Sequence, residues 1–219
     1  MAMNVAIDGP AGAGKSTIAK AIAKKLGYVY VDTGAMYRAM ALYFLRSNIS
    51  KDDEAKISSV VDDISVSIKY EDGAQHVILN GEDVTGLIRT EEVGNIASAT
   101  SVYGPVRTKL VALQQELAKT TDVIMDGRDI GTVVLPNADV KIFLTASVEC
   151  RAKRRYDELV GNGLEADFDQ IAKDIEERDY RDSHREISPL KQAEDAILVN
   201  SSDMTIDEVV STIIGYCNK

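Results

Sequence analysis

The residues best suited to chemistry lie near the start of the chain, in a glycine-rich segment at 9–16 that reads Gly-Pro-Ala-Gly-Ala-Gly-Lys-Ser. This segment fits G-x-x-x-x-G-K-[ST], the pattern of the phosphate-binding P-loop. Glycines let the backbone turn its N–H groups inward around a polyphosphate. Lys15 adds a positive charge for the β- and γ-phosphates, and the Ser16 hydroxyl is placed to bind Mg²⁺. The segment predicts a nucleoside triphosphate site, with Lys15 as an exposed loop residue.

A second group of functional residues follows the apolar run at 122–126, which ends in Asp126. An acid in this position resembles a Walker B element, in which the carboxylate helps to hold Mg²⁺. The chain continues Gly-Arg-Asp-Ile-Gly at 127–131, a segment dense in charge and glycine. We expect it at the carboxyl end of a buried strand, where parallel α/β sheets bind ligands.

A third group, Thr33, Tyr37 and Arg38, follows the apolar run at 28–31. It is expected at the same end of the sheet and is therefore well placed for a ligand. A helix capped by Thr33, with Tyr37 in its packed face, explains these residues equally well without a ligand.

The region between the last two expected strands is the richest in arginine. Arg151, Arg154 and Arg155 have the spacing of one helical face, and a second helix starting near Phe168 carries a similar series at 178, 181 and 185. Solvated helix faces also carry such charges. Six arginines in an acidic chain nevertheless favour a surface for an anion, and a transferring phosphoryl group suits forked guanidinium donors.

The elements that must position these groups follow from the hydrophobic pattern. Short apolar runs predict five buried strands, at 5–7, 28–31, 122–126, 140–144 and 196–199, with helices between them and a capping box at 205–208 that opens the last helix. The first helix should end at Gly27. From residue 64 the period changes to two, and turn signals at Asp72-Gly73 and Asn80-Gly81 predict a three-stranded antiparallel insert at about 64–87.

Composition excludes several classes of protein. The chain has 219 residues and a formal net charge of −10, which argues against a long nucleic acid or an anionic membrane as partner. It contains no apolar run near 18 residues. Its two cysteines and two histidines are isolated, so reduced thiols are expected and zinc is not. We expect a cytoplasmic monomer.

Three enzyme or motor classes are compatible with a P-loop. A GTPase is disfavoured because the chain has no Asn-Lys-x-Asp sequence for guanine, and Gly-Arg-Asp follows Asp126. An ATP-driven motor or transporter subunit usually carries further segments for which this chain is too short. A small P-loop kinase accounts for the P-loop, the second anion-binding region and the arginine-rich hairpin together.

Over essentially its whole length the chain resembles the bacterial cytidylate (CMP/dCMP) kinases. The Asp-Gly-Arg-Asp stretch and the three-stranded insert are specific to this branch of the monophosphate kinases, whereas the P-loop is not. The resemblance is carried by segments 8–16, 32–38, 86–90, 97–98, 126–134, 139–144 and 177–182.

The resemblance implies transfer of a phosphoryl group from ATP to CMP or dCMP with Mg²⁺, by a single P-loop kinase domain spanning 1–219. Its core would be 1–63, 88–150 and 186–219, its acceptor-binding insert about 64–87 and its lid about 151–185. ATP would bind Gly9, Pro10, Ala11, Gly12, Ala13, Gly14, Lys15, Ser16 and Thr17, and the metal Ser16 and Asp126. CMP would bind Thr33, Tyr37, Arg38, Ser98, Arg107, Arg128, Asp129, Arg178, Asp182 and Arg185.

The resemblance also implies a division of labour among these residues. Ser98, Arg107 and Asp129 would contact the cytosine, where a carboxylate accepts a hydrogen bond from the N4 amino group. The charged groups expected to act in catalysis are Lys15, Arg128, Asp129, Arg154, Arg155, Arg178 and Arg185, of which Arg154 and Arg155 belong to the lid. An alternative for Asp129 is that it serves Mg²⁺ or pairs with Arg128.

Overall fold

The computed structural model describes residues 2–71 and 74–218. The chain forms two compact units, one of Met1–Tyr30 with Thr121–Lys219 and the other of Val31–Thr120. Each unit has a buried hydrophobic core of its own. The predicted layout of a single domain with an insert and a lid stays a prediction.

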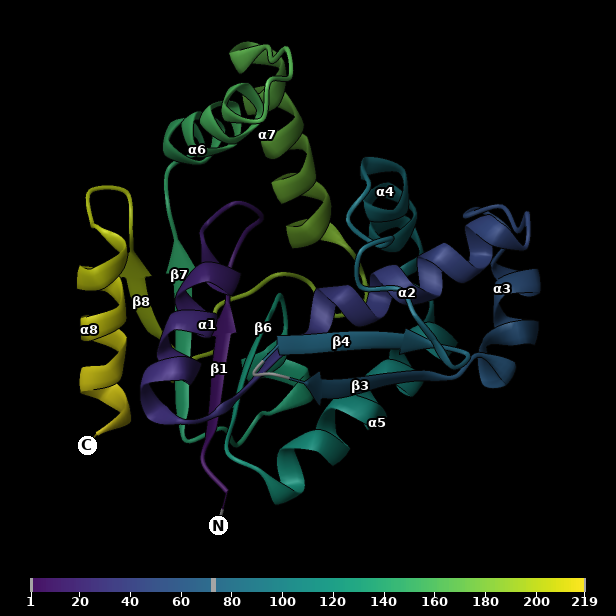
Figure 1. Cartoon of the computed structure of the whole chain (residues 1–219), viewed down its shortest axis with the longest axis horizontal. Helices are drawn as coiled ribbons and strands as arrows, with labels where there is room; N and C mark the ends of the chain where they lie inside the picture. The colour runs from purple at the N-terminus through teal and green to yellow at the C-terminus, as the bar shows by residue number, and fades with distance from the viewer. Residues whose placement is uncertain (1, 72–73, 219) are drawn as a thin grey trace. The chain divides into compact units, whose positions relative to one another are not determined.

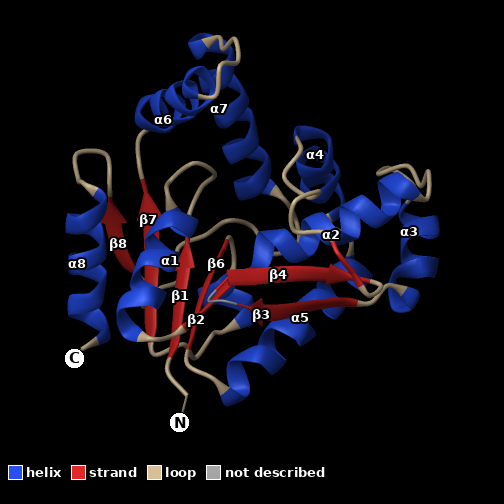
Figure 2. Ribbon diagram, viewed as in Figure 1, coloured by secondary structure: helices blue, strands red, loops and turns tan. Residues whose placement is uncertain are grey.

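The central sheet has five parallel strands in the order β2-β6-β1-β7-β8 (Figures 1 and 2). Its middle strand pairs on both sides, Val5 with Ile124 and with Val140, and the run Val5-Ala6-Ile7 is fully buried. All five predicted strands are therefore confirmed. They are β1 (Asn4–Asp8), β2 (Val29–Asp32), β6 (Val123–Gly127), β7 (Val140–Thr145) and β8 (Ile197–Asn200).

Four helices belong to the first unit: α1 (Lys15–Leu26), α6 (Val148–Gly161), α7 (Phe168–His184) and α8 (Ile206–Cys217). Helix α1 ends at Gly27, which has a left-handed φ of 74°, and α8 opens with the predicted capping box of Thr205 and Glu208. Helices α1 and α8 contact each other and the sheet, whereas α6 and α7 pack together as a hairpin (Figure 1). A π-helical turn, η2 (Ile130–Val134), was not predicted.

The second unit contains the predicted antiparallel sheet, in the order β3-β4-β5. Val66 pairs with Leu79, and Ile78 pairs with Asp83. The Asn80-Gly81 turn has the two positive φ angles, 50° and 88°, that tight hairpins favour, while the Asp72-Gly73 turn lies outside the described residues. The strands are β3 (Val66–Glu71), β4 (Ala74–Leu79) and β5 (Glu82–Asp83).

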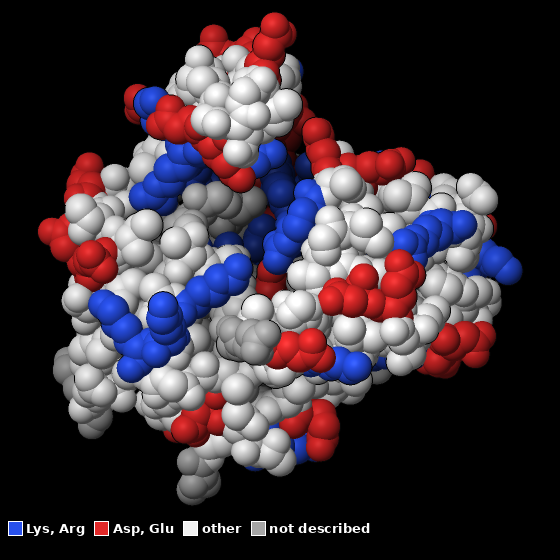
Figure 3. Space-filling view, viewed as in Figure 1, with Lys and Arg blue, Asp and Glu red and all other residues white. Residues whose placement is uncertain are grey.

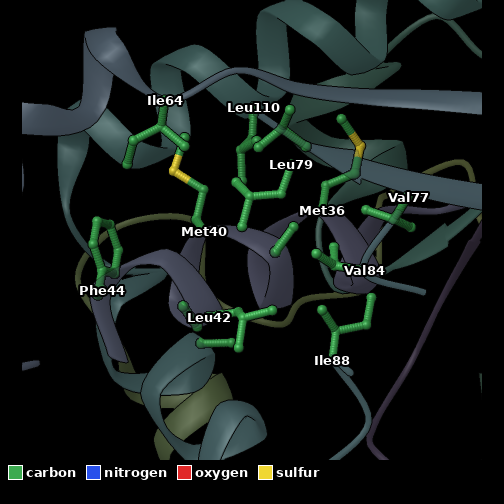
Figure 4. Close-up of a cluster of buried hydrophobic side chains, with 14 of the residues drawn as sticks. Met36, Met40, Leu42, Phe44, Ile64, Val77, Leu79, Val84, Ile88 and Leu110 are labelled. Carbon is green, nitrogen blue, oxygen red and sulfur yellow. The ribbon is translucent and has the colours of Figure 1, made fainter. Parts of the chain in front are cut away.

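The helices of this unit are α2 (Thr33–Arg46), α3 (Glu54–Val60) followed by a 3₁₀ turn (Val61–Asp63), α4 (Glu91–Thr100) and α5 (Gly104–Thr120). Helix α2 lies at the centre of its core. Figure 4 shows Met36 and Met40 of α2 among Leu79 of the sheet and Leu110 of α5. Helix α4 begins after Thr90, whose side-chain oxygen accepts a hydrogen bond from the Val93 N–H. This core fixes the face of α2 that carries Tyr37 and Arg38.

No helix in the described ranges 2–71 and 74–218 is long and apolar enough to cross a bilayer.

Candidate active site

The P-loop connects β1 to α1 and is shaped by close packing at Gly9. Gly9 has φ 149°, and a Cβ placed on it would lie 1.9 Å from the carbonyl oxygen of Leu144 in β7. Only glycine allows the chain to leave the central strand here. Helix α1 then begins after Gly14, which has no side chain to cap the first N–H groups, and the first turn of α1 carries no acidic residue. This helix end can therefore bind an anion.

Lys15 is buried, and the expectation of an exposed lysine is wrong. It is the first residue of α1, and its ammonium folds back to donate to the carbonyl oxygen of Pro10 at 2.7 Å. Burial, and then the positive charge of Arg128, lower its pKa to about 7, while Asp126 and Asp8 act in the opposite direction. A polyphosphate bound at the loop would add negative charge and so favour the charged form of this ammonium.

Ser16 and Asp126 meet at the carboxyl end of β6. The Ser16 hydroxyl donates to Asp126 Oδ2 at 2.8 Å, and the Tyr30 hydroxyl donates to the other carboxylate oxygen at 2.9 Å. A hydroxyl and a carboxylate side by side are oxygen ligands of the kind that Mg²⁺ takes, and Mg²⁺ at such sites completes its shell with phosphates and water. The described residues hold no group of three or more His, Cys, Asp or Glu side chains that could bind a metal. The two residues present fit a Mg²⁺ ion held together with a nucleotide.

The segment after β6 gathers the predicted charged residues of the first unit. Arg128 Nε donates to Asp182 of α7 at 2.8 Å. Burial raises the pKa of Asp182, but Arg128, Arg178 and Arg185 outweigh it and hold this pKa below its ordinary value. The charges of three arginines therefore act on one buried carboxylate. Asp129 is buried in the same segment, directly before η2.

In the arginine-rich hairpin of α6 and α7, guanidinium groups bind acidic side chains and backbone carbonyls of the protein itself. Arg151 points inward, forms a bidentate ion pair with Asp179, and donates to the P-loop carbonyl of Ala11 at 2.9 Å. Arg155 pairs with Glu158. Arg154 is exposed but donates to the backbone of Ser201. Acidic side chains also lie among the basic ones on the face drawn in Figure 3.

The predicted residues of the second unit lie on α2, α4 and α5. The Arg107 guanidinium lies 5.9 Å from the centre of the Tyr37 ring and donates a hydrogen bond to the backbone carbonyl of Ser101. Ser101 caps the end of α4, the helix that contains Ser98. Thr33 is buried, but the side-chain cap of α2 is Asp32, which accepts from the Ala35 N–H at 2.9 Å. The reading of Thr33 as the cap is therefore wrong.

Three contacts of the site were not predicted from the sequence. They are the hydrogen bonds from the η2 backbone to the Asp8 carboxylate, the hydrogen bond from the Tyr30 hydroxyl to Asp126, and the Arg151–Asp179 ion pair. The positions of Asp8 and Tyr30 beside recognised motifs were the available signal. Their partners lie about 100 residues away in the chain.

The five-stranded parallel sheet, the P-loop after its central strand and the Ser16–Asp126 pair define a P-loop kinase. A crystal structure of an uncharacterized protein from Eubacterium ventriosum shares the fold, with a TM-score of 0.53 and 12% identity over 99% of both chains. The cytidylate kinase family model matches residues 5–219. The chain belongs to this family.

Curated relatives are similar over nearly their whole length. The cytidylate kinase of Caldicellulosiruptor saccharolyticus is 54% identical over 212 residues, which are 97% of this chain and 94% of that protein. The cytidylate kinase of Lactobacillus johnsonii is 55% identical over 217 residues, 99% of this chain and 94% of that protein.

Proposed function

We propose that this protein transfers the γ-phosphoryl group of ATP to CMP and dCMP, giving CDP or dCDP and ADP. The observation that carries the proposal is the phosphate-binding turn at 9–16, with its buried Lys15, in a chain that the cytidylate kinase family model matches from residue 5 to residue 219. Transfer rests on positioning and on neutralisation of charge, without a covalent intermediate.

The donor nucleotide is assigned to residues 9–17. The N–H groups at the start of α1 and the Lys15 ammonium bind its phosphates. Ser16 and Asp126 would hold Mg²⁺, and Tyr30 orients the carboxylate of Asp126. When bound, Mg²⁺ neutralises charge on the β- and γ-phosphates.

The acceptor is assigned to the residues that the resemblance implies for CMP. One group of them is Thr33, Tyr37, Arg38, Ser98 and Arg107. The other group binds the sugar and the phosphate and consists of Arg128, Arg178, Asp182 and Arg185, in which the arginines hold the pKa of Asp182 low. Forked guanidinium donors of this kind suit a phosphate ligand, which accepts two hydrogen bonds from one arginine.

Asp129 is proposed to choose the base. Its carboxylate accepts a hydrogen bond from the cytosine N4 amino group, whereas uracil presents an O4 acceptor at that position. Two acceptors facing each other in a buried site cost roughly 1–3 kcal/mol or more, so we expect a preference for CMP over UMP of tenfold to several hundredfold.

Arg154 and Arg155 are proposed to act from α6 on bound ATP, and closure of this hairpin would keep water from the γ-phosphate. We further propose that the enzyme works in the cytoplasm, where its nucleotide substrates are held. We also propose that it works as a monomer, which light scattering at micromolar concentration tests.

The proposal is tested by measuring ADP release with CMP, dCMP, UMP, AMP and shikimate, first for the wild type and then for Asp129→Ala. We expect CMP and dCMP to be the best acceptors, and the variant to lose kcat/KM for CMP with little change for UMP. Asp169→Ala, an exposed aspartate of α7, is the control and should keep the wild-type ratio. A variant that loses activity equally with both substrates would show that Asp129 does not choose the base.

A further inference from the structure

Asp8 is a buried carboxylate for which the proposed reaction has no use so far. It is the last residue of β1, next to Gly9 of the P-loop, and it is 5% exposed. Its two oxygens accept hydrogen bonds from the N–H groups of Ile130 at 2.8 Å and Gly131 at 2.7 Å. The side chain therefore joins the end of the central strand to the segment that follows β6.

These two amides are the first of η2, where a helix has N–H groups without partners inside the helix. The carboxylate of Asp8 satisfies both. Because Arg128 and Asp129 directly precede Ile130, the direction in which their side chains leave the backbone depends on how residues 130 and 131 are held.

Gly131 packs tightly against the Asp8 side chain that holds its backbone N–H. A Cβ added to Gly131 would lie 3.4 Å from Asp8 Oδ2 and 3.2 Å from Cδ of Lys141. Lys141 is itself fixed, since its ammonium donates to the Pro136 carbonyl and to both oxygens of Asp195. Residue 131 therefore has little room to move away from Asp8.

Burial makes this arrangement costly for the carboxylate, and burial raises the pKa of Asp8 to about 6 despite the two N–H donors. An apolar residue would end a buried strand without this cost. The hydrogen bonds that Asp8 accepts from the Ile130 and Gly131 N–H groups explain why a charged side chain stands at this position.

We propose that Asp8 is a positioning residue for the acceptor nucleotide, holding the backbone of Ile130 and Gly131 so that Arg128 and Asp129 face the acceptor. This inference rests on the proposed function, in which Arg128 and Asp129 bind CMP. Through Asp8, the strand that carries the donor loop also sets the geometry of the acceptor loop.

The test is Asp8→Asn, which keeps the shape of the side chain. Asparagine has one acceptor oxygen, and its amide group would face one of the two N–H donors, so one hydrogen bond is lost and two donors oppose each other. We expect the CMP dissociation constant, measured by calorimetry without ATP, to rise about tenfold. This is the effect expected for losing one hydrogen bond to a charged group. ATP binding is a less direct measure, because the charge of Asp8 also raises the pKa of Lys15.

Amide exchange supplies the measurement that a general loss of stability would not reproduce. The Ile130 and Gly131 amides should be protected in the wild type and should lose protection selectively in Asp8→Asn. Ile213→Val, in the buried face of α8 in the same unit, is the matched control and should lower the melting temperature without changing CMP affinity or these two amides.

Each outcome decides the inference. Wild-type CMP affinity in a folded Asp8→Asn protein overturns it, even if the amides lose protection. If Asp8→Asn does not fold, two other results overturn the inference. One is rapid exchange of both amides in the wild type, and the other is unchanged CMP binding in Gly131→Ala. A wild-type protein that binds no CMP refutes the proposed function and this inference with it, while protected amides would still show that Asp8 holds the loop.

Discussion

Arg151 is the side chain whose replacement tests most directly how the P-loop is held. Its guanidinium donates to the carbonyls of Ala146 at 3.0 Å and Ala11 at 2.9 Å, and it forms a bidentate pair with Asp179. Arg151→Met keeps much of the aliphatic stem, which packs against Gly12, and removes every one of these donors. The variant therefore separates hydrogen bonding from packing.

The expected loss can be built from these contacts. Each carbonyl that loses its donor costs about 1 kcal/mol. The Asp179 side chain is 24% exposed, so water reaches the carboxylate that is left, and its pair contributes about 1 kcal/mol, below the range for a fully buried pair. We expect Arg151→Met to lower the free energy of unfolding by about 3 kcal/mol.

Urea unfolding of the wild type, Arg151→Met, Asp179→Asn and the double variant gives the coupling energy between the two side chains, expected at about 1 kcal/mol. The exposed pair Arg155–Glu158 of the same helix, with side chains 51% and 58% exposed, is the control and should couple by less than about 0.5 kcal/mol. Equal coupling in the two pairs, or a loss below about 1 kcal/mol in Arg151→Met, would refute the reasoning.

Three further predictions follow from buried groups of the site. Lys15→Ala should lower kcat by roughly 10²-fold or more. It should not lower the melting temperature at pH 7, because burial of the charged ammonium opposes folding in the wild type. A lower melting temperature in the variant would contradict this. Tyr30→Phe should weaken the Mg²⁺ dependence of ATP binding about tenfold, by calorimetry with and without Mg²⁺, and leave CMP binding unchanged. The pKa of Asp8 rises from 3.8 to about 6 on folding, so its stabilising contribution is full below pH 3.8 and is lost as pH rises through 6. Relative to Asp8→Asn, the wild type should therefore lose about 2 kcal/mol of unfolding free energy between pH 4 and pH 7. A constant difference over that range would count against the burial of this charge.

The features that could be predicted from the sequence are those that depend on residues close together in the chain. The P-loop, the end of α1 at Gly27 and the hairpin at Asn80-Gly81 each depend on backbone angles within a few residues. The strands were predictable because a strand covered on both faces is a continuous apolar run, as in Val5-Ala6-Ile7.

The parts that were missed depend on partners distant in the sequence. The π-helical turn at 130–134 has its first amides held by a carboxylate 122 and 123 residues away. The inward orientation of Arg151 depends on Ala11 and Asp179. Lys15 is a different case, because its ammonium donates to the nearby Pro10 carbonyl and its burial follows from the folded shape of the loop. Charge spacing along a helix shows which residues share a face, but the spacing alone does not show what that face meets.

The division of the chain into a continuous unit and an interrupted one has a consequence for its synthesis on the ribosome. The unit Val31–Thr120 is complete once residue 120 has been made, so its core can form while the rest is still being added. Strand β1 has to wait, because its partners begin at Val123 and Val140. At about 5–20 residues per second, the apolar run at 5–7 is made roughly 6–23 s before its first partner exists. The nascent chain therefore carries a strand whose apolar run is later fully buried, without a sheet to cover it, while chaperones and other nascent chains have access to it.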